Sequence, residues 1–315
     1  MKYRRLYALV CAVLLLTGCS WFSRQEENTV AVLARDLQDC AEQQRTAALQ
    51  EALTDAGYTV QILDAKSDQS AQTQQLKKLL RESCEGVIIQ PVIMDAVPEL
   101  VEMAKKADVP MVFTGRPVQE DVLQLWEKTG FVGVDPEEPG LQQGKILAQM
   151  PDKGDINGDG MLSYILIWDM ADYTDTQLHT ASVFTALTDA QIVLMQLGIS
   201  SADGDREKAR DGCAMLLAEY GKDIEAVICS SDTMALGALE AITESGRTVG
   251  ENIYLLGIGG AQDALEAVEK GNMTGTVRED TETFTQYTLQ LLQQLAEGKA
   301  ERRSFEILSA PVTKQ

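Results

Sequence analysis

The chain has little histidine and none of the short motifs that mark common catalytic sites. His179 is the only histidine, and no GxSxG, P-loop or HExxH sequence occurs in the 315 residues. The glycine-rich stretch GIGGAQ at 257–262 lacks the GxGxxG spacing and the acidic partner that a dinucleotide site needs. Paired acids such as Glu137 and Glu138 are typical of the charged first turn of a helix. We therefore expect that the protein is not an enzyme.

The N-terminal hydrophobic run is too short to cross a membrane as a mature helix. It follows the basic start MKYRR and consists of the 11 residues LYALVCAVLLL. The run ends in LTGC, where an apolar residue, a small residue and Gly precede Cys19, as in the lipobox of bacterial lipoproteins. This pattern predicts a signal peptide at 1–18, a lipid on Cys19, a polar tether over 19–28 and a place on the extracytoplasmic face of the cell membrane. The alternative is a plain signal peptide with a chance cysteine.

The cysteines and the charge exclude further classes. Five cysteines remain after residue 18, without CxxC spacing or a histidine pairing, so buried thiols are expected rather than a disulfide framework or a zinc site. Removing 1–18 removes three basic residues and no acid, which changes the formal charge from −21 to −24. A field of that sign repels nucleic acid and favours divalent cations. No nucleic-acid partner is expected.

Short apolar runs alternate with stretches of helical spacing from residue 29 onward. The first half contains TVAVLA, YTVQILDA, GVIIQ and VPMVFTG, and the second contains FVGVD, SYILIW, EAVICSS and IYLLGIGG, each followed by a helical segment. Strands and helices in alternation predict parallel, doubly wound sheets. The sequence therefore predicts two α/β lobes with a ligand cleft between them, beyond the carboxyl ends of the strands.

The stretch DINGDGMLS, Asp155 to Ser163, has the start of a calcium loop. Oxygen-bearing side chains stand at alternate positions, and Gly160 stands at the sixth position, where a calcium loop turns sharply. The twelfth position, which would need Glu, is Leu166. The plain alternative is a polar turn of Asx and Gly residues between a helix and a strand.

These features together resemble the bacterial glucose/galactose-binding protein family, a type I periplasmic fold. The segments SDQSAQTQQLKKLLRESCEGVIIQPV, FVGVDPEEPGLQQGKIL, DINGDGMLSYILI, EAVICSSDTMALGALEAI and GTVRED fall in that family's order over about residues 29–310. The resemblance implies a binding protein that delivers sugar to an ATP-driven importer. It also implies a three-strand hinge and a monomer, with lobes at 29–114 plus 280–300 and at 115–279 plus 301–315.

The resemblance also implies a structural calcium ion whose last ligand is a distant Glu before a strand. Carried over, the ligand set is Asp155, Asn157, Asp159, the carbonyl of Met161, Ser163 and Glu225. Ser163 stands where the family usually has a side-chain amide.

The sugar pocket departs from the family more than the loop does. The aligned ligand-binding positions hold Asp39, Gln90, Tyr173, Asp175, His179, Ser231 and Glu279. Gly259 replaces an Asp, and Ala41 and Gly204 stand where the family has the two aromatic plates. Helix capping is an alternative role for Asp39 and Asp175.

The substitutions leave the ligand open. A site that lacks the Asp acceptor for vicinal hydroxyls should bind a different set of ligands, because unpaired polar contacts discriminate strongly. A more polar solute is indicated by the possible charged lining residues Arg35, Asp36, Arg116, Arg278 and Glu279. Two functions remain: solute delivery to a membrane permease, and an extracytoplasmic ligand sensor that partners a receptor or histidine kinase.

Overall fold

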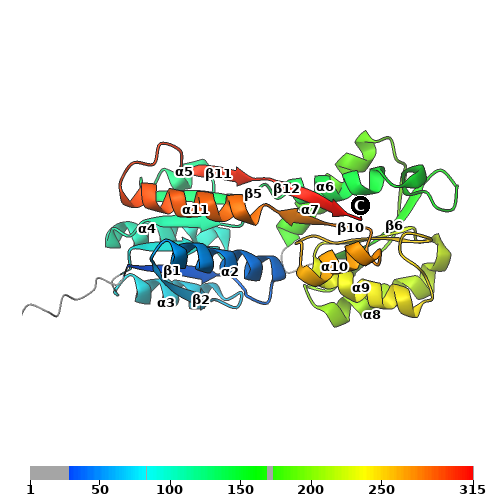
Figure 1. Ribbon diagram of the computed structural model, residues 1–315, viewed down its shortest axis with the longest axis horizontal. Helices are drawn as coiled ribbons and strands as arrows, with labels where there is room; N and C mark the ends of the chain where they lie inside the picture. The colour runs from blue at the N-terminus through cyan, green and yellow to red at the C-terminus, as the bar shows by residue number, and fades with distance from the viewer. Residues whose placement is uncertain (1–27, 83, 169–172, 315) are drawn as a thin grey trace, which may run out of the picture.

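The computed structural model describes residues 28–82, 84–168 and 173–314. The side chains of Cys40 and of residues 173–176 lie outside this description, as do the predicted signal peptide, Cys19 and nearly all of the tether. Among the described residues, no helix is both long and apolar enough to cross a membrane. Figure 1 shows two lobes side by side along the long axis of the molecule.

The first lobe is built on a six-stranded parallel sheet of order β11-β5-β4-β3-β1-β2. Its strands are β1 (Thr29–Ala34), β2 (Thr59–Asp64), β3 (Gly86–Ile89), β4 (Met111–Thr114), β5 (Thr129–Val134) and β11 (Ser304–Ile307). Its helices are α2 (Cys40–Asp55), α3 (Gln69–Leu79), α4 (Val97–Ala107), the short α5 (Glu120–Leu123) and α11 (Thr281–Ala296), with the 3-10 turn η1 (Met94–Ala96) before α4.

The second lobe has a six-stranded sheet of order β12-β10-β9-β8-β6-β7. Its strands are β6 (Leu162–Trp168), β7 (Leu194–Ser201), β8 (Ala226–Cys229), β9 (Tyr254–Leu256), β10 (Gly275–Glu279) and β12 (Ser309–Thr313). Its helices are α6 (Glu138–Ala148), α7 (Tyr173–Asp189), α8 (Arg206–Tyr220), α9 (Asp232–Glu244) and α10 (Gln262–Lys270), with 3-10 turns η2 (Pro151–Gly154) and η3 (Gly221–Asp223).

Both faces of each sheet are buried, which explains why the strands read as continuous apolar runs. Along β1, Val30 and Val32 point to the α2 and α11 side, while Ala31 and Leu33 point to the α3 and α4 side. In the second lobe, α8, α9 and α10 cover one face of the sheet and α6 and α7 the other. Cys213 and Cys229 are buried free thiols, as the sequence predicts, and Cys84 is half-buried.

The lobe boundaries predicted from the sequence need correction. β5 pairs with β4, with Phe113 opposite Phe131, and β11 pairs with β5, so both strands belong to the first lobe. The chain therefore crosses after Val134 and at Leu308, rather than near Gly115 and Ala300, whereas the third crossing, at Asp280, lies next to the expected Glu279. An apolar run shows that a strand forms, but backbone pairing decides which sheet it joins.

The last strand, β12, is not anticipated by the sequence pattern. It runs antiparallel to β10, with Glu279 opposite Ser309, in a sheet whose other pairs are parallel. Only Leu308 separates the end of β11 in one sheet from the start of β12 in the other. In Figure 1, β10 and β12 run through the middle of the molecule, where the lobes join.

Candidate functional site

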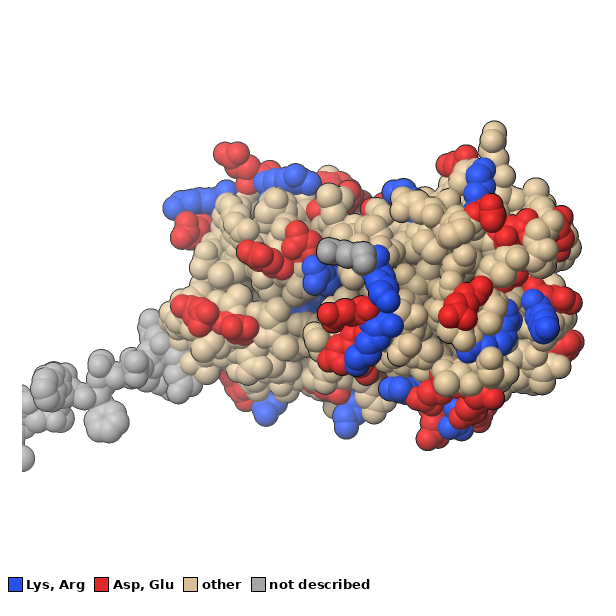
Figure 2. Space-filling model, turned by 45° about the vertical axis from the view of Figure 1, so that its right-hand side comes forward, with Lys and Arg blue, Asp and Glu red and all other residues tan. Residues whose placement is uncertain are grey.

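A cleft of about 950 Å³ lies between the lobes at the carboxyl ends of both sheets. It is lined by residues that directly follow the strands, such as Arg35 after β1, Gln90 after β3 and Arg116 after β4. Ser230 follows β8, and Ile258 lies just beyond β9 on the other side. Figure 2 shows charged side chains of both signs where the two lobes meet. This is the position at which doubly wound sheets bind ligands.

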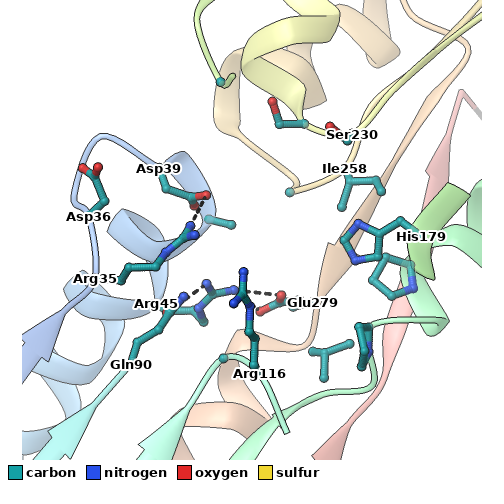
Figure 3. A pocket seen from close by; sticks show the side chains of 18 of the residues that line it. Arg35, Asp36, Asp39, Arg45, Gln90, Arg116, His179, Ser230, Ile258 and Glu279 are labelled. Atoms are coloured by element: carbon teal, nitrogen blue, oxygen red, sulfur yellow. Dashed lines mark hydrogen bonds and ion pairs between the residues drawn. The ribbon is translucent and has the colours of Figure 1, made fainter. Parts of the chain in front are cut away.

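The wall contributed by the first lobe is charged. Asp39 is the N-cap of α2 and accepts a hydrogen bond from the Glu42 N–H at 2.8 Å. Its other carboxylate oxygen lies 3.4 Å from the Arg35 guanidinium. Asp36 closes the turn before the helix by accepting from the Gln38 N–H at 3.0 Å. The loop between β1 and α2 thus holds an arginine and two aspartates at the rim of the cleft (Figure 3).

The floor of the cleft contains a half-buried ion pair. Arg45 from α2 places one nitrogen 2.8 Å from each oxygen of Glu279, the last residue of β10, and their side chains are only 14% and 24% exposed. Burial acts to lower the pKa of Arg45, but the carboxylates of Glu279 and Asp39 outweigh it and raise the pKa. Gln90 lies beside this pair and packs against Gly115, where a Cβ would lie only 2.8 Å from the Gln90 side chain.

A buried carboxyl supports the charged wall from behind. Glu42 is 2% exposed and accepts hydrogen bonds from the backbone N–H groups of Arg35 and Asp36. Burial raises the pKa of Glu42 to about 7, although the nearby Arg35 and Arg45 act to lower it. Asp39 caps the helix and Glu42 holds the backbone of Arg35 and Asp36, so the two carboxyls together fix the loop that lines the cleft.

The wall contributed by the second lobe combines serines and glycines with the charged residues Asp203, Asp205 and Lys208. Ser231 is the N-cap of α9, and Ser230, Ile258 and Gly259 lie beside it in the lining. Asp232 turns inward, where it accepts from the Thr276 hydroxyl at 2.6 Å and the Ala261 N–H at 2.7 Å. Burial raises the pKa of Asp232 to about 6. This carboxyl therefore fixes the loop after β9 and offers little charge to a ligand.

The described lining residues include no Trp or Tyr side chain. Ala41 and Gly204, at the positions of the family's aromatic plates, both line the cleft. A Cβ built on Gly259 would lie 4.0 Å from the Ala41 Cβ, so small residues of the two lobes face each other here. Neither Ala41 nor Gly204 offers a stacking face to a hexose, and the aromatic side chains among the described lining residues are His179 and Phe284.

Five of the seven predicted ligand-binding residues line this one cleft: Asp39, Gln90, His179, Ser231 and Glu279. The side chains of Tyr173 and Asp175 lie outside the described residues, although both residues begin α7. Of the additional charged candidates, Arg35, Asp36 and Arg116 line the cleft, whereas Arg278 is exposed outside the lining. Whether any of these residues binds a ligand stays a prediction.

Sequence reasoning missed two polar groups of the cleft. Arg45 lies inside a helix and belongs to no sequence motif. Its place in the cleft becomes visible through its ion pair with Glu279. Ser309 belongs to the unanticipated strand β12, and its hydroxyl is buried without a hydrogen-bond partner among the described residues. No local pattern in the sequence marks either residue.

The Asp155–Ser163 loop lies in the second lobe, away from the cleft. Asp155 accepts from the N–H groups of Gly158, Asp159 and Gly160 at 2.7 to 3.2 Å. Asn157 accepts from the Asp159 N–H, and Asp159 accepts from the Met161 N–H. The side chains at alternate positions thus fold the loop on itself.

Glu225 reaches this loop from the residue before β8, as the resemblance implies. It is 1% exposed, and one oxygen accepts from the N–H groups of Ile156 and Asn157 at 2.6 and 2.9 Å. The other oxygen accepts from the Ser163 N–H at 2.8 Å. The carboxylate therefore closes the loop through three backbone hydrogen bonds.

Carboxylate oxygens that the resemblance assigns to calcium, those of Asp155 and Glu225, accept backbone hydrogen bonds in this structure. The described residues contain no group of three acidic, His or Cys side chains placed to hold a metal. Both Glu225 oxygens already accept backbone hydrogen bonds, so a bidentate bond to an ion would require the carboxylate to turn away from them. The predicted calcium ion stays a prediction, and no part of the proposed function depends on it.

Two doubly wound lobes, three crossings and a polar cleft define a two-lobed solute-binding protein of the periplasmic type. A family model described as "Periplasmic binding protein domain" matches residues 30–300, and the chain belongs to this family.

Two curated relatives are named for sugars. The chain is 30% identical over 254 residues to the D-galactose/methyl-galactoside binding periplasmic protein MglB of Haemophilus influenzae, covering 79% of this chain and 76% of that protein. It is 27% identical over 258 residues to the ribose import binding protein RbsB of Bacillus subtilis, covering 81% and 76%.

Solved structures confirm the fold. A solute-binding protein of Actinobacillus succinogenes with bound D-allose aligns with a TM-score of 0.78 at 16% identity, covering 91% of this chain and 97% of that one. A solute-binding protein of Bacillus halodurans with bound myo-inositol gives 0.76 at 22% identity, covering 91% and 94%. The predicted two-lobe α/β fold is thereby confirmed.

Proposed function

We propose that this protein is the extracytoplasmic solute-binding component of an ATP-driven importer and takes a sugar or sugar-like molecule in its interlobe cleft. The cleft carries this proposal, because polar side chains from the strand ends of both lobes converge on about 950 Å³. Pockets of roughly 300–1,000 Å³ suit small molecules. Family membership and the galactose- and ribose-binding relatives support the same class.

Capture would proceed by closure of the lobes about the crossings at Val134, Asp280 and Leu308. A solute held first by the charged wall of the first lobe would be covered by the serine-lined wall of the second. The Arg45–Glu279 pair joins α2 of the first lobe to the end of β10, so it holds the floor in place while the lobes move.

A narrower proposal is that the ligand is galactose or glucose. The resemblance of the sequence and the relative at 30% identity favour it. The residues of the cleft do not, because Gly259 and the positions of both aromatic plates carry no side chain that could grip a hexose. We therefore propose the sugar class, and leave the hexose as one member of it.

The same proposal includes attachment to the membrane through a lipid on Cys19 and a membrane permease as partner. The LTGC pattern at the end of the hydrophobic run supports the lipid. A monomer is proposed as the working form.

A sensor that reports to a membrane receptor or histidine kinase is the second candidate. The replacement of both aromatic plates by Ala41 and Gly204 favours it, because a ligand-reporting domain need not keep an importer's sugar. Measuring sugar uptake in cells that lack the protein separates the two functions, since only the importer component affects uptake.

Binding itself is tested by calorimetry and thermal unfolding of the protein, starting from residue 20, with pentoses, hexoses, inositols and their acidic and amino derivatives. A ligand should raise the melting temperature by mass action. No binding by any member of this panel would refute the sugar proposal.

A further inference from the structure

The two lobes differ in charge at their outer ends. The carboxyl ends of both sheets face the cleft, so the amino ends of the parallel strands lie away from it, together with the carboxyl ends of the helices. We call these outer surfaces the bases of the lobes, and count each from the last turn of an α-helix to the start of the next strand. The base of the first lobe has equal numbers of basic and acidic side chains, whereas that of the second has twice as many acidic as basic ones.

The basic side chains of the first base gather at two neighbouring helix ends. α3 and α4 each carry two lysines in their last turn, and both helices pack on the same face of the first sheet. An arginine follows directly after the end of α3. We call the surface formed by these five residues the basic surface: Lys77, Lys78, Arg81, Lys105 and Lys106.

Helix dipoles alone do not explain the basic surface. Cations near the carboxyl end of a helix interact favourably with its dipole, which is the plain alternative. However, α2, α8, α9 and α11 all end without a basic residue in the last turn. The dipole therefore does not require such residues, and their concentration at α3 and α4 is a property of this part of the surface.

Three of the five cations have no counterion in the described part of the protein. Lys77, Arg81 and Lys106 are exposed, and none of them forms an ion pair with another described residue. The other two lie 4.0 and 3.8 Å from exposed glutamates, and such surface pairs are weak. The basic surface can therefore interact with anions outside the protein.

The shape of the surface also suits a lipid headgroup. A shallow hollow of about 330 Å³ lies at the end of α3, and it is lined by Gln74, Lys77, Lys78, Arg81 and Glu82. Leu125, which is 39% exposed, lies beside the end of α4, since the Lys105 ammonium donates to its carbonyl at 2.9 Å. Clusters of cations at a membrane surface bind anionic headgroups.

The chain enters the folded part of the molecule at this same base. Thr29 starts β1, and its carbonyl accepts from the N–H of Glu85, four residues after Arg81, at 2.8 Å. In Figure 1, β1 begins at the end of the first lobe that faces away from the second. With the proposed lipid on Cys19, residues 19–28 join the anchor to β1 and span at most about 35 Å. The anchor therefore keeps the basic surface near the headgroups.

We propose that the basic surface rests on the anionic headgroups of the membrane, so that the molecule stands on its first lobe with the second lobe away from the bilayer. The inference rests on the membrane attachment in the proposed function and names the face that meets the lipid. Each basic side chain near an anionic surface strengthens binding by about fivefold. The acidic base of the second lobe is repelled by the same surface, which sets the orientation.

Photochemical cross-linking on vesicles tests this orientation. The protein from residue 20 onward carries an N-terminal hexahistidine tag, which attaches it to nickel-chelating lipids in place of the lipid on Cys19. The vesicles consist of phosphatidylcholine with or without phosphatidylglycerol, and both kinds contain a trace of phosphatidylcholine with a photoreactive headgroup. We expect at least about tenfold more cross-linking within residues 77–82 and 105–108 on the anionic vesicles, and a loss of the difference at high salt.

A triple variant removes the three cations that have no counterion. Lys77→Gln/Arg81→Gln/Lys106→Gln should lower cross-linking of these two segments on anionic vesicles by about tenfold to hundredfold. Circular dichroism verifies that the variant is folded.

The matched control changes the formal charge by the same amount at three exposed lysines of the second lobe. Lys145→Gln/Lys222→Gln/Lys314→Gln should leave the cross-linking of the first base unchanged. A difference between the two triple variants therefore reports the position of the cations and not the total charge of the protein.

Three results would overturn the inference: equal cross-linking on neutral and anionic vesicles, cross-links spread equally over the bases of both lobes, or an equal effect of the two triple variants. Each of them leaves the proposed solute binding intact, because the calorimetric panel measures that separately. A mature protein without a lipid on Cys19, identified by mass spectrometry of the membrane fraction, would instead refute the attachment on which the inference rests.

Discussion

The β1–α2 segment of the first lobe and the β8–α9 segment of the second reach the cleft in the same way but present different chemistry to it. Each runs from a strand end through an N-cap, Asp39 or Ser231, into a helix. Each also has a buried carboxyl near the helix start with a raised pKa, about 7 for Glu42 and about 6 for Asp232.

The difference lies in what the buried carboxyl holds. Glu42 holds the loop of its own segment, which keeps Arg35 and Asp36 at the cleft surface. Asp232 holds a neighbouring strand and loop through Thr276 and Ala261, and the cleft surface beside it consists of Ser230, Ser231 and Gly259. The same local device therefore places charged side chains at the cleft surface in the β1–α2 segment and small neutral ones in the β8–α9 segment.

The largest effect on stability is expected where this charged surface is most buried. Arg45→Met leaves the Glu279 carboxylate without its partner, which should cost about 3–5 kcal/mol of unfolding free energy. Urea unfolding measures it. The double variant Arg45→Met/Glu279→Met should recover most of the loss, and a single-variant cost below about 1 kcal/mol would show that the pair is not desolvated.

The second lobe has its own buried carboxylate, Glu225, and its removal should be almost as costly. Glu225→Ala deprives the N–H groups of Ile156, Asn157 and Ser163 of their acceptor, which should cost about 3 kcal/mol in excess chelator. The exposed Glu251→Ala is the control.

The effect of calcium on the melting temperature tests whether Glu225 holds the loop backbone, as in this structure, or binds a metal ion, as the resemblance implies. If Glu225 acts through the backbone, chelator leaves the melting temperature of the parent protein unchanged and Glu225→Ala lowers it regardless. If calcium stabilises the parent but not the variant, Glu225 is a metal ligand, as the resemblance implies.

The pH dependence of the unfolding free energy should distinguish Glu42 from Asp232, and this effect is expected to be smaller than those of the substitutions above. The folded state holds the Glu42 proton more tightly than the unfolded chain, since its pKa rises from 4.5 to about 7. Its contribution to stability is therefore greatest at low pH and falls as pH rises from about 4.5 to about 7, by about 2–3 kcal/mol.

Thermal unfolding across this range, in the parent and in Glu42→Gln, measures the contribution. The variant should lose this fall and keep a weaker one from Asp232, whose pKa rises from 3.8 to about 6. An unchanged pH profile in Glu42→Gln would contradict the prediction.

The smallest effect is expected at the two N-caps. Asp39→Ala and Ser231→Ala should each cost about 1 kcal/mol of unfolding free energy through loss of the cap alone. Calorimetry with a bound ligand then compares the lobes: a loss of affinity only in Asp39→Ala would place ligand recognition in the first lobe, and equal losses would remove the distinction between the walls.

The sequence predicted the parts of the molecule that depend on local pattern. Apolar runs identified the central strands of both lobes, such as β3 and β8, since these are buried along their whole length. Pairing is not local, so the sheet joined by β5 and the antiparallel strand β12 could not be read from the pattern.

The site shows the same division. Asp39, Gln90, Ser231 and Glu279 follow or end strands, where a cleft residue is expected, and all line the cleft. Arg45 lies in the second turn of α2, and its long side chain carries the charge to the floor. A motif marks where a backbone segment lies, whereas the reach of a side chain depends on the packing around it.

The single residue Leu308 between β11 and β12 limits how the molecule can move. Its side chain is 72% exposed, and its carbonyl accepts from the Asp280 N–H at 3.2 Å, which ties two of the crossings together. Relative rotation of the lobes at this point must pass through the two backbone torsion angles of one residue. Because this hydrogen bond joins Leu308 to Asp280, we expect the backbone torsion angles at these two crossings to change together when the lobes rotate.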